Sequence, residues 1–433
     1  MSRLIGTMVL VCGVTANLLA TDVPSYRIVS ETSNDTETAL VVNYVSMNAD
    51  GTGTATLSGL ISIPKTLPAT AVLLDNHHTI ASNSEAPSVA KATASAMLFR
   101  GKYLIVAPDY YGYGISKDKP HTYLCYEQNV ANCIDFALVA RRIIDSLNVD
   151  FVVDSMFNVG YSQGGGVAMV VHRALDKNPE LANELHFSKS WCGAGPYDVS
   201  LTLNEILSGG TISYPVLLPM VIKGFMAGYP QCFAKSRKFS DFFNKDLIDA
   251  GLESWVDSKN LTTEEVSEKM LNVTSDNSIK SMLNPDVFDE KSVLRAELQA
   301  VADKNNLLCD WNLVHPMTLL HQPSDEVVPF INTQKAIEYL NLPANEQIIT
   351  NWNLKHSSFG TIFYLYVAGY MEEMVKSINN DSPFGSEPNS IVEEPAIEKL
   401  DLNQPMYDIS GRRVGKDYQG VVIQNGKAYV RIH

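Results

Sequence analysis

Ser162 is the residue of this chain best placed to act as a nucleophile. It lies in the pattern Gly160-Tyr-Ser-Gln-Gly164, between a short apolar run and a segment with apolar residues at helical spacing. A strand that turns sharply into a helix would lift the Ser162 hydroxyl above a sheet, and the flanking glycines would let the two elements approach closely. The alternative is an ordinary serine in a glycine-rich turn, because this short pattern also occurs by chance.

A nucleophilic serine needs a histidine base that is itself oriented by a carboxylate. Asp325 follows an apolar run in the context Asp-Glu-Val-Val-Pro, where a loop at a strand end can direct its carboxylate toward the serine. Its neighbour Glu326 is the competing candidate, which we expect to be solvated. We therefore predict Asp325 as the acid.

His356 is the histidine that follows this acid at the expected place. It lies in Leu354-Lys-His-Ser-Ser-Phe-Gly360, which we expect to form a loop before the final helix. His315 precedes its strand and His321 precedes the acid, so both are poorer candidates for the base. The predicted order is Ser162, Asp325, His356.

Two backbone amides are expected to stabilise the oxyanion that forms when a serine attacks a carbonyl. One is the N–H of Gln163 at the start of the helix, and the other is the N–H of Thr79 in the loop after an earlier strand. His77 and His78 in that loop suggest a metal pair as an alternative. Adjacent side chains diverge and no matching acidic ligands are evident, so no metal site is predicted.

These residues must be positioned by alternating strands and helices, which indicate a mostly parallel sheet covered by helices. The first two strands are expected to be antiparallel, and helices are expected over 89–100, 129–147, 262–271 and 333–340, besides the one that starts at Gln163. The expected strands cover residues 38–47, 55–63, 71–75, 103–107, 156–160, 187–191, 317–321 and 347–352.

Residues 196–304 interrupt this alternation and are too many for a structureless loop. The segment contains an apolar stretch from Tyr214 to Tyr229 and then charged helical stretches. We predict a helical cap over the active site, with packing against the main core as the simpler alternative.

Taken together, residues 38–378 resemble an α/β-hydrolase, most similar to the bacterial secretory lipase and esterase group. The resemblance is carried by Leu57-Ser-Gly-Leu-Ile-Ser-Ile-Pro64, Ala107-Pro-Asp-Tyr-Tyr-Gly-Tyr-Gly-Ile-Ser116, the serine pattern and the acid and histidine segments. Asp109 is expected to be structural, and His78 stands where relatives commonly have glycine. The resemblance implies an α/β-hydrolase fold over residues 21–380 with the cap inserted.

The ends of the chain differ from this catalytic part. Residues 1–20 have one charge, Arg3, and an apolar stretch, and predict a signal peptide cleaved near Ala20. Residues 381–400 are rich in Pro, Ser and Glu and predict a linker. Residues 401–433 carry a hairpin signal at Asn425-Gly426 and resemble the C-terminal sorting modules of secreted Bacteroidetes proteins. A small packing hairpin is the alternative.

Composition narrows the possible partners. The 433 residues include 33 basic and 48 acidic side chains, which argues against a nucleic-acid partner. Cleavage after Ala20 would remove Cys12 and leave an odd number of cysteines, of which Cys125 could pair with Cys133 and Cys192 with Cys232.

These observations predict a secreted serine hydrolase that cleaves carboxylic esters through an acyl-enzyme and needs no cofactor. Its expected partners are a small-molecule, lipid or carbohydrate ester and, through the C-terminal segment, a secretion machinery. A serine peptidase and a non-catalytic surface-binding protein are the alternatives. The acyl chain, the alcohol and the oligomeric state stay open.

Overall fold

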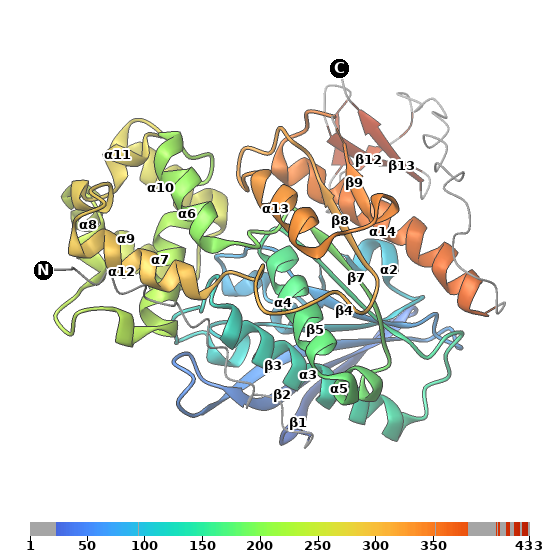
Figure 1. The fold of residues 1–433 in the computed structure, drawn as a ribbon. Helices are drawn as coiled ribbons and strands as arrows, with labels where there is room; N and C mark the ends of the chain where they lie inside the picture. Colours follow the sequence, from blue (N-terminus) through green and yellow to red (C-terminus); the bar gives the residue numbers. More distant parts are fainter. Residues whose placement is uncertain are drawn as a thin grey trace, which may run out of the picture.

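The computed structural model describes residues 23–93, 95–350, 352–379, 404, 406–407, 413–415, 420–424 and 427–431 (Figure 1). The predicted signal peptide and linker lie outside these residues.

A nine-stranded sheet forms the centre of the part of the chain up to Asn379. Its order is β1-β2-β3-β5-β4-β6-β7-β8-β9; pairing is antiparallel from β1 to β5 and parallel from β5 to β9. The strands are β1 (Tyr26–Ser33), β2 (Glu37–Met47), β3 (Thr54–Pro64), β4 (Val72–Asn76), β5 (Leu104–Pro108), β6 (Met156–Tyr161), β7 (Phe187–Gly193), β8 (Met317–His321) and β9 (Gln347–Ile349).

Eight of these strands match the segments expected from the sequence, and β2 and β3 are antiparallel as predicted. The strand β1 was not predicted. It lies at the sheet edge with nearly all its side chains exposed, so its sequence lacks the apolar alternation that marks a half-buried strand. The prediction for residues 347–352 was too long, because β9 ends at Ile349.

Helices cover both faces of the sheet (Figure 1). The helices α3 (Tyr126–Leu147), α4 (Gln163–Lys177) and α5 (Pro179–Glu184) pack on one face, where Leu74 and Val106 point. The helices α2 (Ala96–Phe99) and α14 (His356–Asn379) pack on the other, where Leu73 and Ile105 point. Adjacent strand residues thus bury opposite faces, as expected for central parallel strands.

The single helix expected over 89–100 is wrong. Instead α1 (Pro87–Ala90) ends at Lys91, whose φ of 53° is left-handed, and a separate short helix, α2, begins at Ala96. A left-handed residue terminates an α-helix, and periodicity alone does not reveal it.

A helical insertion, residues 199–304, connects β7 to β8 and stands to one side of the sheet (Figure 1). Its helices bury Phe225, Phe242 and Met270 in an apolar core that continues into the main fold, where it includes Met169 of α4 and Leu319 of β8. Its α-helices are α6 (Val199–Gly209), α7 (Leu217–Gly228), α8 (Lys245–Asp249), α9 (Leu252–Ser258), α10 (Thr263–Thr274), α11 (Ile279–Met282) and α12 (Val293–Lys304).

Lys259 joins this insertion to the loop that precedes α3. It follows α9 and is only 6% exposed, and its ammonium group donates to the carbonyl oxygens of Gly112 (2.5 Å), Lys117 (2.8 Å) and Lys119. Its own carbonyl accepts from the Asn83 N–H at 2.7 Å. Burial lowers the pKa of Lys259 to about 8, so it is mostly protonated at neutral pH. One buried cation thus satisfies three carbonyl groups of a neighbouring loop.

The C-terminal strands form a separate four-stranded sheet of order β11-β10-β12-β13. The strands β12 (Gly420–Gln424) and β13 (Lys427–Arg431) pair antiparallel with Gln424 opposite Lys427, which is the hairpin expected there; Asn425 and Gly426 lie outside the described residues. The other two are β10 (Met406–Tyr407) and β11 (Arg413–Val414).

In the described part of the chain, Cys125, Cys133, Cys192 and Cys232 are free thiols, so neither disulfide considered from the sequence is formed. Cys125, Cys133 and Cys192 are buried, and burial raises the pKa of each thiol. Cys232 and Cys309 are partly buried. Of the helices in the described ranges, none is both long enough and apolar enough to span a membrane.

Replacing Lys259 should loosen the helical insertion. We expect Lys259→Ala to lower the free energy of unfolding by roughly 1–3 kcal/mol, because buried carbonyls lose their donor, and to speed proteolysis between α9 and α10. Thermal unfolding and limited proteolysis measure this. The control is Lys245→Ala, which removes an exposed ion pair with Asp249 and should leave both unchanged. Equal behaviour of the two variants would contradict a tethering role for Lys259.

Candidate active site

The carboxyl ends of the parallel strands bring the predicted site residues to one edge of the sheet. Ser162 follows β6, the Thr79 loop follows β4, Asp325 follows β8, and His356 follows β9. Ligand sites in open α/β sheets lie at this edge.

Ser162 occupies a tight turn between β6 and α4. Its φ of 59° and ψ of −122° lie outside the usual regions for an L-residue, and its N–H donates to the Gly193 carbonyl at 2.9 Å. Only glycine fits nearby, because a Cβ on Gly160 would lie 2.0 Å from the Gly164 oxygen and one on Gly164 would lie 2.1 Å from the Asn76 oxygen. The two glycines of the motif therefore permit the turn that presents the serine.

His356 lies between Ser162 and Asp325. Its Nε2 is 2.8 Å from Ser162 Oγ, and its Nδ1 is 2.6 Å from Asp325 Oδ2. An ionised carboxylate cannot donate, so Nδ1 carries the proton and Nε2 accepts from the serine hydroxyl. The structure corrects one expectation: His356 is the first residue of α14, not part of a preceding loop. Only 7% of the surface of His356 is exposed, so its imidazole contacts the serine in a setting that is largely shielded from water.

Asp325 is held in place by several donors. Its Oδ1 accepts the N–H groups of Val327 and Val328, each at 2.9 Å, and its side chain is fully buried. Burial raises the pKa of Asp325, but the hydrogen bonds from His321 and His356 outweigh it and hold the pKa well below its ordinary value. Asp325 is therefore ionised at neutral pH.

Glu326 does not contact the imidazole in place of Asp325. It is exposed, and its Oε2 accepts the backbone N–H of His356 at 3.0 Å. That bond caps the first turn of α14 with a carboxylate, which favours the N-terminal end of a helix.

Gln163 directly follows the serine and begins α4. The N–H of Gln163 is the first of α4, a position without an acceptor inside the helix. The Gln163 side chain donates to His121 Nε2 at 2.8 Å, and His121 Nδ1 donates to the Tyr111 carbonyl at 2.7 Å. Burial lowers the pKa of His121 to about 3, so this support stays neutral.

Thr79 is fixed through its side chain, because its Oγ1 lies 2.9 Å from the Tyr123 hydroxyl. Tyr123 also lines the pocket beside Ser162. The loop is further anchored by His77, whose ring nitrogens face the carbonyl oxygens of His78 (2.7 Å) and Asp109 (3.2 Å).

Burial lowers the pKa of His77 to about 4, so its ring is neutral and its single N–H can donate to only one of these two carbonyl oxygens. In the ranges that the structure describes, His, Cys, Asp and Glu form no group of three able to hold a metal ion. Asp109 has the structural role expected of it: buried, it accepts from the hydroxyls of Ser58 and Ser88, each at 2.5 Å.

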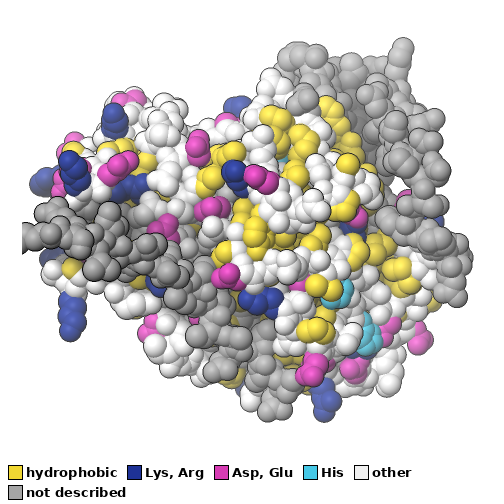
Figure 2. Space-filling view, in the orientation of Figure 1, with side chains coloured by type: hydrophobic (Ala, Val, Ile, Leu, Met, Phe, Trp, Pro, Cys, Tyr) yellow, Lys and Arg dark blue, Asp and Glu magenta, His cyan; other side chains and the backbone are white. Residues whose placement is uncertain are grey.

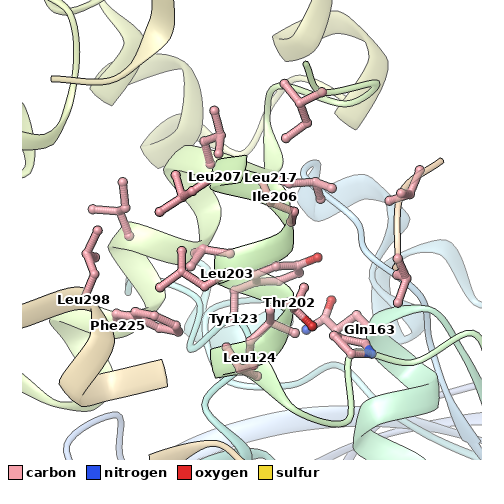
Figure 3. Close-up of a pocket in the computed structure, with 18 of the residues that line it drawn as sticks. Tyr123, Leu124, Gln163, Thr202, Leu203, Ile206, Leu207, Leu217, Phe225 and Leu298 are labelled. Carbon is pink, nitrogen blue, oxygen red and sulfur yellow. The ribbon is translucent and has the colours of Figure 1, made fainter. Parts of the chain in front are cut away.

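An apolar pocket opens beside Ser162. Its volume is about 810 Å³, including the part that is open to solvent. Gln163, Thr202 and Tyr123 lie at one end, and Leu203, Phe225 and Leu298 extend beyond them (Figure 3). The polar lining residues are Tyr123, Ser162, Gln163 and Thr202, and the described lining includes no charged side chain. The apolar ones are Leu124, Pro196, Val199, Leu203, Ile206, Leu207, Ile212, Leu217, Leu218, Val221, Ile222, Phe225, Leu283, Val287, Leu298, Val327 and Val328.

Two contacts at the site were not predicted from the sequence. The Tyr161 hydroxyl donates to the His356 carbonyl at 2.7 Å, and His321 Nε2 lies 3.1 Å from Asp325 Oδ2. Tyr161 occupies the variable position before the serine, which nothing in the pattern marks. The spacing of His321 and Asp325 in the sequence does not by itself predict a contact, because the contact depends on the turn after β8.

The chain was compared with known proteins. No protein-family model matches it, and neither does any curated protein. Solved structures do match. A rice cell wall degrading esterase, LipA, of Xanthomonas oryzae superposes with a TM-score of 0.63 at 20% identity over 83% of this chain and 98% of that one.

Two further structures give the same result. A Legionella pneumophila protein matches with a TM-score of 0.65 at 17% identity, over 80% of this chain and 96% of its own. Candida antarctica lipase A in its closed state matches with a TM-score of 0.56 at 14% identity, over 82% and 83%. With its mostly parallel sheet flanked by helices, the chain therefore has the α/β-hydrolase fold.

Proposed function

We propose that this chain is a serine hydrolase that cleaves carboxylic esters of apolar acids by acyl transfer. The observation that carries the proposal is the unbroken hydrogen-bonded series Ser162–His356–Asp325, whose serine lines an apolar pocket. The esterase and lipase structures that share the fold support the same class of reaction.

In the first half of the reaction, Ser162 Oγ attacks the ester carbonyl carbon while His356 Nε2 takes the hydroxyl proton. Asp325 stabilises the imidazolium. The oxyanion accepts from the N–H groups of Gln163 and Thr79. When the tetrahedral intermediate collapses, the bond to the alcohol oxygen breaks and His356 gives its proton to the leaving alcohol.

In the second half, water replaces the alcohol. His356 takes a proton from water as its oxygen attacks the acyl carbon, and the same two amides hold the new oxyanion. The bond to Ser162 Oγ then breaks, the serine recovers its proton, and the free acid leaves. Each step uses groups that belong to this chain.

The pocket favours an apolar acyl group over a peptide terminus. A peptidase that recognises a free terminus needs a charged partner, and the described lining of the pocket has none. Leucine, valine and isoleucine side chains from α6 and α7 make up eight of its 21 lining residues. We therefore prefer an esterase or lipase to the peptidase alternative.

A non-catalytic binding protein is the other alternative. It gives no reason for a strained serine paired with a buried imidazole, since strain of this kind is retained where function needs it. Labelling of Ser162 by a fluorophosphonate probe distinguishes a reactive serine from a merely buried one.

We further propose that the enzyme acts outside the cytoplasm, with residues 1–20 as a signal peptide and the C-terminal segment 401–433 presented to a secretion machinery. An ester is the expected partner, and a nucleic acid is not. On the face drawn in Figure 2, the described Lys and Arg side chains are scattered among acidic and neutral ones, in keeping with the net charge of −15.

Removing the nucleophile tests the proposal directly. Ser162→Ala should reduce kcat for short p-nitrophenyl esters by roughly 10⁴-fold or more, because acyl transfer to the enzyme is lost. It should also abolish fluorophosphonate labelling. The control is Ser208→Ala, an exposed serine of α6, which should keep full activity. Wild-type turnover by the Ser162 variant would refute the assignment.

Filling the pocket should change the preferred acyl length. Leu203→Trp is expected to reduce kcat/KM for long-chain p-nitrophenyl esters by roughly 10-fold or more while sparing acetate, since the larger ring occupies space that a long chain needs. The matched control is Glu205→Trp on the exposed side of α6. If both variants keep the wild-type chain-length profile, the acyl group binds elsewhere.

A further inference from the structure

His321 is a second histidine on the acid of the site. It ends β8, four residues before Asp325, and both side chains are fully buried. Its Nε2 lies 3.1 Å from Asp325 Oδ2, the same oxygen that lies 2.6 Å from His356 Nδ1. One carboxylate oxygen thus faces two imidazoles.

The partners of His321 determine its tautomer. Asp325 is ionised and can only accept, so Nε2 of His321 carries a proton. Its Nδ1 lies 2.7 Å from Thr333 Oγ1, and a neutral ring accepts the hydroxyl proton there. Burial lowers the pKa of His321 against the opposing effect of Asp325, in keeping with a neutral ring. The result is a fixed series from Thr333 through His321 to Asp325.

We propose that His321 is a positioning residue that fixes Asp325 and limits how strongly this carboxylate stabilises the protonated form of His356. The inference rests on the proposed function, because it assigns His356 as the base. His321 touches neither the substrate nor the serine in this role, and acts only through Asp325.

Sharing of one oxygen is the physical reason. A hydrogen bond to a carboxylate oxygen withdraws charge that would otherwise stabilise a second partner. The other oxygen, Oδ1, already accepts the N–H groups of Val327 and Val328. The two imidazoles therefore compete for the charge on Oδ2. Removing the donor on His321 should therefore leave more charge for His356.

Other titratable groups also face this cluster and would stay in place. The Tyr161 hydroxyl is 3.3 Å from His356 Nδ1, and Glu326 accepts the His356 backbone N–H. His78 interacts electrostatically with His356 from the loop after β4. Since these groups are common to wild type and variants, a difference between variants at position 321 reports on that side chain.

The test compares two substitutions at one position. His321→Leu removes the donor, whereas His321→Gln places an amide nitrogen near the former Nε2 and can still donate. We expect the acid limb of the kcat/KM–pH profile for p-nitrophenyl butyrate to move to higher pH by roughly half a unit in His321→Leu, and to return close to wild type in His321→Gln. The pH dependence of fluorophosphonate labelling should shift in parallel.

A purely structural role predicts a different result. It would lower kcat in both variants without moving the acid limb. An unshifted limb in folded His321→Leu would overturn the proposal. If that variant does not fold, Thr333→Val removes the hydroxyl that orients His321 and should give a smaller shift in the same direction; an unshifted limb there would equally overturn it.

Failure of the proposed function gives a separate signature. In that case wild type itself would show no Ser162-dependent hydrolysis or labelling, whatever residue stands at position 321. Active, labelled wild type with unchanged acid limbs would refute the role of His321 alone.

Discussion

The first turn of α4 is wedged between the ends of two strands. A Cβ on Gly164 would lie 2.1 Å from the Asn76 oxygen of β4, and one on Gly165 would lie 2.3 Å from the Gly193 oxygen of β7. This contact joins Ser162 and the first amide of the helix to the end of β4, so the proposed nucleophile and both proposed oxyanion donors lie on elements that touch one another. Asp325 and His356 approach from strands farther along the same sheet, and their hydrogen bonds connect them to Ser162 by side-chain contacts.

Local sequence patterns predicted the turns and strands whose conformation depends mainly on neighbouring residues. The turn at Ser162 follows from glycine spacing, and the buried strands follow from short apolar runs bounded by turns. The helix expected over 89–100 failed because the left-handed conformation of Lys91 is not encoded in apolar periodicity. The exposed edge strand β1 carries no periodic signal to find. Contacts such as Tyr161 with His356 join residues almost two hundred positions apart, and only the fold brings them together.

The helical insertion lines the apolar pocket with one side of α7 and places the other side at the surface. Two sides of α7 serve different purposes: Leu217, Val221 and Phe225 line the pocket, whereas Lys223 binds Glu253 and Asp257 at the surface. The apolar stretch of the sequence therefore shapes a binding cavity as well as a core. Lys259 binds three carbonyl groups of the loop before α3, so polar contacts join the insertion to the rest of the fold in addition to apolar packing.

The buried thiols of the core have a consequence for how the chain meets oxidants. Cys125, Cys133 and Cys192 are enclosed by the core and too weakly acidic to form thiolates at neutral pH, so oxidants and thiol reagents have little access to them in the native state. Modification of these three thiols would therefore report the opening of the core around them, and not the reactivity of the native surface.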